Sequence, residues 1–330
     1  MQEIVLCGAG NKGSELYAFL KYMIEELNCA QIIAVIDREK DNLDGIKILR
    51  PEMIGELNPE ALFIITPENE EIRRYYKNLL RGKKTVFYDQ YFDFAELLDV
   101  DRTTLNRVRC AFYHIEEMDE YFDEAEGKEL LNIFWEEGSV FKRLFRELDL
   151  NNVIELACGR GRHVPNYINL SGHITLVDIL QKNIDLCKMR FSDYQHISYY
   201  KNQGYDLMEL NDNEYTSIFS YDAMVHFELL DINTYLTDFY RVLKPGGRAL
   251  IHHSNFDAIY NGRFGRSLAY GRSFMNYKIF SYLALHAGFT ILDQQLLRWH
   301  NLPDLDCVTL LEKPIKGMIV ESEYGKTMKF

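Results

Sequence analysis

Apolar and polar positions follow two regular patterns along most of the chain. Short apolar runs, typical of buried strands, alternate with stretches in which apolar residues recur every three or four positions, as on one face of a helix. Strands that alternate with helices predict a parallel sheet covered on both faces. We therefore expect a small Rossmann-type domain over residues 1–95. Its strands are predicted at Ile4 to Leu6, Ile32 to Ile36, Ala61 to Ile65 and Thr85 to Tyr88, with helices after Gly13 and from Glu68 to Arg81.

The same alternation resumes after an acidic stretch. Residues 96–128 carry closely spaced acidic pairs within a helical pattern, and we interpret them as a helical linker with a solvated face. Residues 129–315 again show strand and helix patterns, so a second α/β domain is expected there. Residues 316–330 have few periodic apolar positions and predict a loosely packed tail. A chain of 330 residues is long enough for two such cores.

Composition narrows the range of functions. Hydrophobic residues make up 47% and charged residues 26%, as in ordinary soluble proteins. A net charge of −13 argues against a nucleic-acid partner, because phosphate backbones are bound by lysine and arginine. The six cysteines show no CxxC spacing, which indicates reduced thiols and neither disulfides nor a metal site. With no leader-like or membrane-spanning run, a cytoplasmic protein without a membrane partner is expected, and a homodimer is compatible with the sequence.

Two features of the second half point to a nucleotide-like ligand. An apolar strand from Val153 runs into a turn of small residues ending at Arg162, where the backbone can approach a ligand closely. A second strand, Ile174 to Val177, ends in Asp178, 23 positions after Glu155. A carboxylate at that strand end is placed to accept hydrogen bonds from ribose hydroxyls.

Two further features follow in order. The run from Ile218 to Phe227 carries polar groups from a strand end into a loop. At residues 240–251 a helix pattern stops at Lys-Pro-Gly-Gly and a strand pattern begins. Proline and paired glycines supply the helix breaker and the left-handed backbone that such a turn needs.

Taken together, the four features resemble the class I S-adenosylmethionine-dependent methyltransferase family, and the turn that reads RVLKPGG is the most specific of them. The resemblance covers about residues 130–313 and implies a seven-stranded sheet with S-adenosylmethionine across its strand ends. It departs from the family in its first motif, where Glu155 and Ala157 replace the usual aspartate and glycine. By this resemblance Gly159 and Gly161 would contact the methionine part, Asp178 the ribose, Gly204 and Asp206 the adenine, and Ser220 and Tyr221 the sulfonium side; Glu155, Ala157 and Ile179 complete the predicted cofactor-binding set.

The chemistry itself is less firmly indicated. Methyl transfer needs a positioned nucleophile and, where necessary, a base, so we predict a small polar acceptor that receives the methyl group on oxygen or nitrogen. His226 is the candidate general base, because imidazole titrates near neutral pH; the alternative is a histidine that only bonds backbone. The candidate substrate contacts are Asp222, His252, His253, Asn255 and Arg272.

Each of these contacts has an alternative. Adjacent histidines in a strand point to opposite faces, so His252 and His253 do not predict a shared metal ion. Arg272 would suit a carboxylate, phosphate or polyol, or else form a salt bridge. Asp222 would either contact substrate or hold its own loop.

The first half carries its own glycine turn. Gly8, Gly10 and Gly13 lie between a strand and a helix, and Asp37 ends the next strand, which is the context of a dinucleotide-binding fingerprint. These residues, with the Phe-Ile-Ile-Thr-Pro run at 63–67, resemble the small Rossmann domain at the N-terminus of bacterial sugar acyltransferases. The resemblance implies a nucleotide or nucleotide-sugar site, and a sugar of surface polysaccharide synthesis as acceptor. A fold kept for docking or dimerisation is the alternative.

Two other functions stay open. An NAD(P)-dependent oxidoreductase would use the turn at Gly8 to Gly13, although the second half shows no evident hydride-transfer site. A non-enzymatic protein would use both halves to sense nucleotides.

Overall fold

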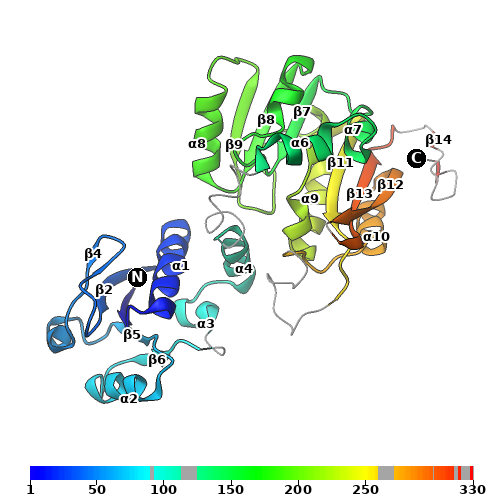
Figure 1. Ribbon diagram of the computed structural model, residues 1–330. Helices are drawn as coiled ribbons and strands as arrows, with labels where there is room; N and C mark the ends of the chain where they lie inside the picture. Colours follow the sequence, from blue (N-terminus) through cyan, green and yellow to red (C-terminus); the bar gives the residue numbers. More distant parts are fainter. Residues whose placement is uncertain are drawn as a thin grey trace. The chain divides into compact units, whose positions relative to one another are not determined.

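The structure is a computed structural model that describes residues 1–89, 93–112, 125–258, 271–299, 301–315, 319–320 and 328–329. The chain divides into two compact units, Met1–Phe112 and Tyr113–Phe330 (Figure 1). None of the helices in the described ranges is long and apolar enough to span a membrane.

The first unit is built on a four-stranded sheet in the order β2-β1-β5-β6, with all neighbours parallel. Its two inner strands are wholly apolar and buried from Ile4 to Cys7 and from Leu62 to Ile65. The predicted Rossmann-type sheet is thereby confirmed. The elements are β1 Gln2–Cys7, α1 Asn11–Leu27, β2 Ala30–Ile36, β3 Asn42–Leu43, β4 Ile46–Lys47, a 3-10 helix Pro51–Glu56, β5 Leu62–Ile65, α2 Glu70–Leu79, β6 Thr85–Phe87, α3 Phe94–Leu98 and α4 Arg102–Ala111.

Helices α3 and α4 belong to this first unit. Phe94 and Phe112 meet the ring of Phe19 on α1 edge-on, with centroid separations of 5.2 and 5.4 Å. The unit therefore extends past the boundary expected at residue 95 and takes in the start of the predicted linker. Most of the acidic pairs of that linker lie in 113–124, outside the described residues.

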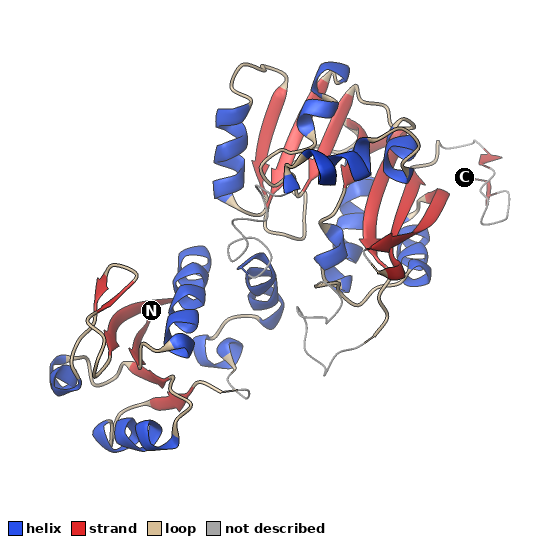
Figure 2. Ribbon diagram, viewed as in Figure 1, coloured by secondary structure: helices blue, strands red, loops and turns tan. Residues whose placement is uncertain are grey.

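The second unit contains a seven-stranded sheet in the order β12-β13-β11-β10-β7-β8-β9, in which β13 runs antiparallel to both of its neighbours (Figure 2). The predicted class I methyltransferase fold is confirmed by this sheet. Its strands are β7 Asn152–Leu156, β8 His173–Asp178, β9 Ile197–Lys201, β10 Tyr215–Ser220, β11 Leu243–Ser254, β12 Thr290–Trp299 and β13 Leu302–Glu312. Its helices are α6 Lys128–Trp135, α7 Val140–Phe145, α8 Gln181–Arg190, α9 Leu229–Val242 and α10 Tyr277–Ala287, with 3-10 turns at Val164–Asn166, Ile168–Leu170 and Met224–His226, and a short pair of strands, β14 Ile319–Val320 and β15 Met328–Lys329.

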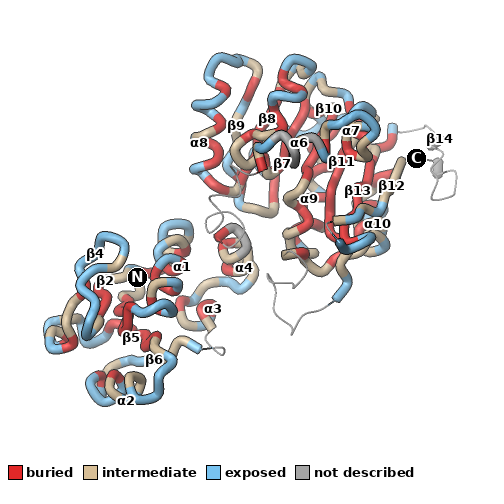
Figure 3. The backbone as a smooth tube through the Cα atoms, in the orientation of Figure 1, coloured by how far each residue is buried: buried red, intermediate tan, exposed pale blue. Residues whose placement is uncertain are grey.

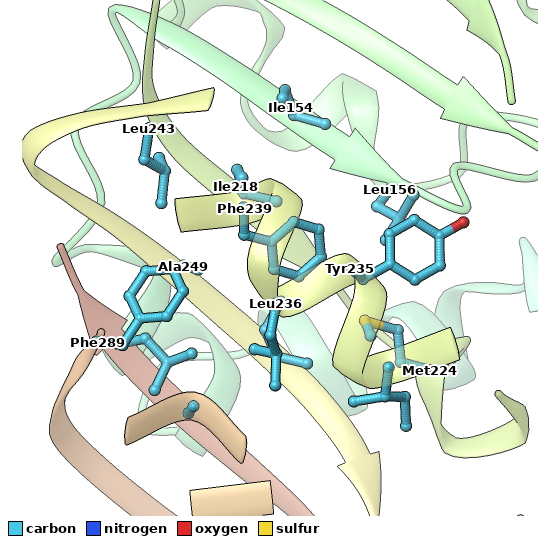
Figure 4. Packing of buried hydrophobic residues seen from close by; sticks show 14 of the residues in the cluster. Ile154, Leu156, Ile218, Met224, Tyr235, Leu236, Phe239, Leu243, Ala249 and Phe289 are labelled. Carbon is cyan, nitrogen blue, oxygen red and sulfur yellow. The ribbon is translucent and has the colours of Figure 1, made fainter. Parts of the chain in front are cut away.

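Alternate residues of the strands face two separate cores. Ile154 and Ile218 pack with α9 and α10, as Figure 4 shows around Leu236. Their neighbours Val153 and Phe219 pack with α6, α7 and α8 on the other face. The strands are buried on both sides while the outer helix faces are exposed (Figure 3). The order of the strands reverses between β7 and β10, and in such sheets the ligand crevice lies outside the carboxyl ends at that point.

The Lys-Pro-Gly-Gly turn is tied to Lys313, which follows β13, the strand next to β11. The Gly246 N–H donates to the carbonyl of Lys313 at 2.7 Å, and the Lys313 N–H donates to Gly247 at 2.9 Å. The Lys313 ammonium also donates to the carbonyls of Tyr240 and Leu243, at 2.6 and 2.7 Å, where α9 ends. A buried lysine therefore caps the helix that precedes the turn.

Candidate active site at the strand ends of the second unit

The turn after β7 bends through left-handed backbone at three positions. Ala157, Gly159 and Gly161 have φ values of 56°, 53° and 78°. This region favours glycine, and an L-residue there costs about 1–2 kcal/mol. A Cβ at Gly161 would lie 2.5 Å from the ring of Phe191, so that position needs glycine for space as well. Ala157 therefore occupies a position that favours glycine. The tight turn predicted after this strand still forms.

Asp178, at the end of β8, holds this turn in place. Its Oδ2 accepts from the Gly159 N–H at 2.9 Å, and its Oδ1 accepts from the Leu180 N–H at 2.9 Å and from Asn183 Nδ2 at 3.1 Å. Burial raises the pKa of Asp178, and these hydrogen bonds oppose the rise. The backbone N–H of Ile179 also contributes to holding the charged form of this carboxylate. Ile179, the next residue, is half-buried.

Glu155 lies beneath the turn rather than on it. Its side chain is buried and accepts a hydrogen bond of 2.5 Å from the Tyr167 hydroxyl. Burial raises the pKa of Glu155 to about 8, so the group is protonated at neutral pH. The buried Glu155 side chain, bonded to Tyr167, therefore supports the end of β7.

The loop after β9 presents an unpaired acceptor. Asn202 Nδ2 donates to the Asp206 carbonyl at 3.0 Å and to the Tyr235 hydroxyl at 2.7 Å, and its oxygen accepts from the Gly204 N–H at 3.2 Å. Asp206 Oδ1 accepts from Tyr200, whereas the buried Oδ2 has no hydrogen-bond partner among the described residues. Buried acceptors of this kind are costly unless something donates to them.

The end of β10 is enclosed by aromatic rings. Ser220 Oγ is buried and also lacks a hydrogen-bond partner in the described part of the chain. The Tyr221 ring lies 4.1 Å from that of Phe141 and 4.7 Å from that of Phe134, and it stacks on His252 at 4.5 Å, all centroid distances. Burial raises the pKa of the Tyr221 hydroxyl, so this side chain stays neutral.

Asp222 fixes the loop that leaves β10. Its φ is 58°, and its Oδ2 accepts from Arg162 Nη2 at 2.9 Å. Its N–H donates to His252 Nδ1 at 3.0 Å. Burial raises the pKa of Asp222, but the lowering by Arg162 and His252 outweighs it. The pKa is therefore below its ordinary value and the group is ionised. The geometry supports the interpretation that Asp222 holds its own loop.

His226 ends the same loop and has the tautomer of a base. Its Nδ1 lies 2.9 Å from the Gly271 carbonyl, which can only accept, so Nδ1 carries the proton and the neutral ring has its lone pair on Nε2. Burial lowers the pKa of His226 and the Arg272 charge adds to this, while Gly271 and Asp222 oppose it. The ring is therefore neutral at pH 7.

His252 has the opposite arrangement. Its Nδ1 lone pair is taken by the Asp222 N–H, so the proton is on Nε2. That nitrogen lies 3.2 Å from Asp306 Oδ2, at a distance but not an alignment that makes a hydrogen bond. Of the two histidines, His226 is the one whose neutral form carries its lone pair on Nε2.

Arg272 is engaged by a residue that sequence reasoning did not place in the site. Its Nε and Nη2 donate to the two oxygens of Asp306 at 2.8 and 2.6 Å, and its guanidinium lies 4.7 Å from the Trp299 ring centroid. Asp306 is wholly buried on β13, between Leu305 and Cys307. A carboxylate within an apolar strand is the sequence signal that could have identified it. The pair matches the salt-bridge alternative, and a contact of Arg272 with substrate stays a prediction.

Two other predicted substrate contacts are used by the fold. His253 faces the opposite core, where its ring stacks on Phe280 at 3.8 Å and burial lowers its pKa to about 3. Asn255 donates to the Asp304 carbonyl at 2.7 Å and accepts from the Tyr277 N–H at 2.9 Å. The structure does not bring either side chain together with His226 and His252.

The glycine turn of the first unit has a comparable geometry. The Ala9 N–H donates to Asp37 Oδ2 at 2.7 Å. Burial raises the pKa of Asp37, but backbone hydrogen bonds outweigh this and lower it. A Cβ at Gly13 would lie 2.0 Å from the Gly8 carbonyl oxygen, whereas one at Gly10 would meet no atom within 4 Å. The turn is thus closely packed at its ends and open at Gly10.

Comparison with known proteins agrees with this description of the second unit. Residues 154–251 match a protein-family model described as a methyltransferase domain, which spans β7 to β11. The match supports the predicted methyltransferase domain and its predicted cofactor, S-adenosylmethionine. None of the curated proteins matches the chain.

Solved structures resemble the chain weakly. A protein of Pyrococcus horikoshii OT3 is 18% identical, with 62% of this chain and 95% of that one covered and a TM-score of 0.43. A SAM-dependent methyltransferase from Methanosarcina mazei is 13% identical, with 53% and 99% covered and a TM-score of 0.45. An S-adenosylmethionine-dependent methyltransferase from Mesorhizobium loti is 14% identical, with 52% and 96% covered and a TM-score of 0.42.

Proposed function

We propose that the second unit is an S-adenosylmethionine-dependent methyltransferase that transfers a methyl group to an oxygen or nitrogen of a polar small molecule. The observation that carries the proposal is the Asp178–Gly159 hydrogen bond in a domain whose residues 154–251 match a methyltransferase family. This bond joins an acidic strand end to a glycine turn at the carboxyl ends of the strands, where sheets of this kind bind their ligands.

The residues present fit this cofactor. Asp206 Oδ2 and Ser220 Oγ are buried without partners among the described residues. A nucleoside with hydroxyl and amino donors would satisfy such acceptors. When bound, the cofactor supplies a methyl group on a positively charged sulfur. The residues proposed to hold it are Ala157, Gly159, Gly161, Asp178, Ile179, Gly204, Asp206, Ser220 and Tyr221, with Glu155 as the buried support.

His226 is proposed as the general base. A proton leaving an acceptor O–H or N–H would pass to Nε2, while the Nδ1 proton stays bonded to the Gly271 carbonyl. The positive charge that then forms on the ring is stabilised by Asp222 and Asp306, both of which raise the pKa of His226. The lowered resting pKa keeps the ring in its basic form at neutral pH.

The acceptor is proposed to be a sugar or nucleotide-sugar. Support comes from the first unit, whose turn at Gly8, Gly10 and Gly13, held by Asp37, has the form of a nucleotide-binding turn with an open face.

The test is methyl transfer from radiolabelled S-adenosylmethionine to the small-molecule fraction of a cell extract. We expect labelled product with the full chain, a loss of about 10²–10⁴-fold with His226→Gln, and no change with His286→Gln, an exposed histidine of α10. Absence of labelled product would contradict the methyltransferase proposal. Undiminished product with His226→Gln would contradict the base alone.

Methyl transfer and nucleotide binding, measured together, separate the two other functions. A non-enzymatic nucleotide sensor gives no methylated product in any fraction. An NAD(P)-dependent oxidoreductase would instead bind nicotinamide dinucleotide at Gly8 to Gly13, which calorimetry with NADH and NADPH measures.

A further inference from the structure

Asp306 is connected to both ends of the loop that carries His226. On one side its carboxylate binds Arg272, and the residue before Arg272 is Gly271, whose carbonyl accepts from His226 Nδ1. On the other side Asp306 Oδ2 lies 3.2 Å from His252 Nε2, and His252 Nδ1 accepts from the Asp222 N–H. Asp306 is thus linked through His252 to Asp222, where the loop begins, and through Arg272 to His226, where it ends.

The segment around Arg272 is held in several directions. Next to it, the Ser273 N–H donates to the Val225 carbonyl at 2.9 Å, and the Ser273 carbonyl accepts from Ser254 Oγ at 2.8 Å. Asp306 is paired with Ser254 in the β11–β13 ladder. One continuous set of contacts therefore joins Asp306 and Arg272 to Gly271, whose carbonyl accepts from His226.

We propose that Asp306 is a positioning residue, which through Arg272 and Gly271 holds His226 in the tautomer that leaves Nε2 basic, and through His252 holds the start of the same loop. This inference rests on the proposed role of His226 as general base. Asp306 does not itself need to touch the acceptor or the cofactor. Its carboxylate is fully buried, binds Arg272 and lies 3.2 Å from His252 Nε2.

The charges around His226 make the proposal testable without knowing the acceptor. Arg272 lowers the pKa of His226, whereas Asp222 and Asp306 raise it. If the set of contacts stays intact, removing the negative charge of Asp306 lowers that pKa, and removing the positive charge of Arg272 raises it. Burial is the largest cause that lowers the pKa of His226, so mere loosening of the packing would raise it in both variants.

The experiment is a pH titration of the full chain labelled with ¹⁵N-histidine, followed by long-range ¹H–¹⁵N NMR, with the His226 signals assigned by their loss in His226→Gln. We expect the Nδ1–H tautomer in the wild type, a lower His226 pKa in Asp306→Asn and a higher one in Arg272→Gln. Asp304→Asn, an exposed aspartate of the same strand, is the matched control and should leave the signals unchanged. Shifts in the same direction for the two variants, or no shift in either, would overturn the proposal.

A double variant covers the case in which a single variant fails to fold. Removing one partner of a buried ion pair is strongly destabilising, whereas replacing both by apolar residues is tolerated. Arg272→Met with Asp306→Leu is expected to fold and to show His226 as a mixture of tautomers. A single Nδ1–H tautomer in this variant would contradict the positioning role. Calorimetry with S-adenosylmethionine on the same samples tests the proposed function separately. If the wild type failed to bind the cofactor, the proposed function would be contradicted, but the measured tautomers of His226 would still decide the positioning role of Asp306.

Discussion

Asp178 Oδ2 accepts a hydrogen bond of 2.9 Å from the backbone N–H of Gly159. The first unit repeats this contact, with Asp37 accepting from Ala9 at 2.7 Å. In each unit a carboxylate at the end of the second strand fixes the turn that follows the first strand. In the second unit, buried acceptors such as Asp206 Oδ2 also lack a partner among the described residues.

The glycines of the first unit predict opposite results for the same substitution. Gly13→Ala would place a Cβ 2.0 Å from the Gly8 carbonyl oxygen, so we expect a loss of about 1–3 kcal/mol in the free energy of unfolding of this unit. Gly10→Ala meets open space at a φ of −66° and should change that free energy by less than about 1 kcal/mol. Denaturant unfolding measures both, and equal destabilisation by the two variants would contradict the packing described for the turn.

Gly10→Ala also tests whether the turn binds a nucleotide. The open face at Gly10 is where a phosphate would approach the backbone, so a methyl group there should abolish binding while the unit stays folded. Calorimetry with a nucleoside diphosphate is the measurement. Equal binding to the wild type and to Gly10→Ala would exclude a site at this face.

Glu155 predicts a pH-dependent stability. Its pKa is about 8 in the folded chain and 4.5 ordinarily, so within that window the folded state holds a proton that the unfolded state has lost. The contribution of Glu155 to stability is complete below pH 4.5 and declines towards pH 8, by up to about 1.4 kcal/mol per pH unit. Glu155→Gln, which can still accept from Tyr167, should flatten this decline in denaturant unfolding at pH 5.5 and pH 8. An unchanged pH dependence in the variant would show that Glu155 is ionised in the folded chain.

Substitution of Lys313 should lower the stability of the second unit without weakening the binding of S-adenosylmethionine. Lys313→Met removes three charge-assisted hydrogen bonds, to Asn213 Oδ1 and to the carbonyls of Tyr240 and Leu243. We expect the free energy of unfolding to fall by about 2–3 kcal/mol, with the affinity for S-adenosylmethionine unchanged. The exposed Lys244→Met is the control for charge. If both variants unfold at the same denaturant concentration, Lys313 is not the cap of α9.

Much of the fold could be predicted because its signals are local. Apolar runs predicted the strands. The Lys-Pro-Gly-Gly sequence was predicted to precede a strand but lies within β11 Leu243–Ser254, where the pairing with β10 shifts in register. The alternation of a strand also predicted that His252 and His253 face different cores, which their stacking on Tyr221 and Phe280 confirms.

The partners of the charged groups could not be predicted in this way. Arg272 and Asp306 are separated by 34 positions and meet where the Ser273 carbonyl bonds Ser254, which pairs with Asp306 in the β11–β13 ladder. Sequence reasoning could therefore assign Arg272 to a substrate or to a salt bridge but could not decide between them. The tautomers of His226 and His252 likewise depend on Gly271 and Asp222, contacts that need the folded loop.

The central claim is that Asp178 and the glycine turn of the second unit bind S-adenosylmethionine. Titration calorimetry with this cofactor tests it directly on the full chain, with Asp178→Ala and with Asp185→Ala, an exposed aspartate of α8. We predict binding to the wild type, an affinity about 10–100-fold weaker in Asp178→Ala, and wild-type affinity in Asp185→Ala. Failure of the folded wild type to bind, or equal binding to all three, would contradict the account.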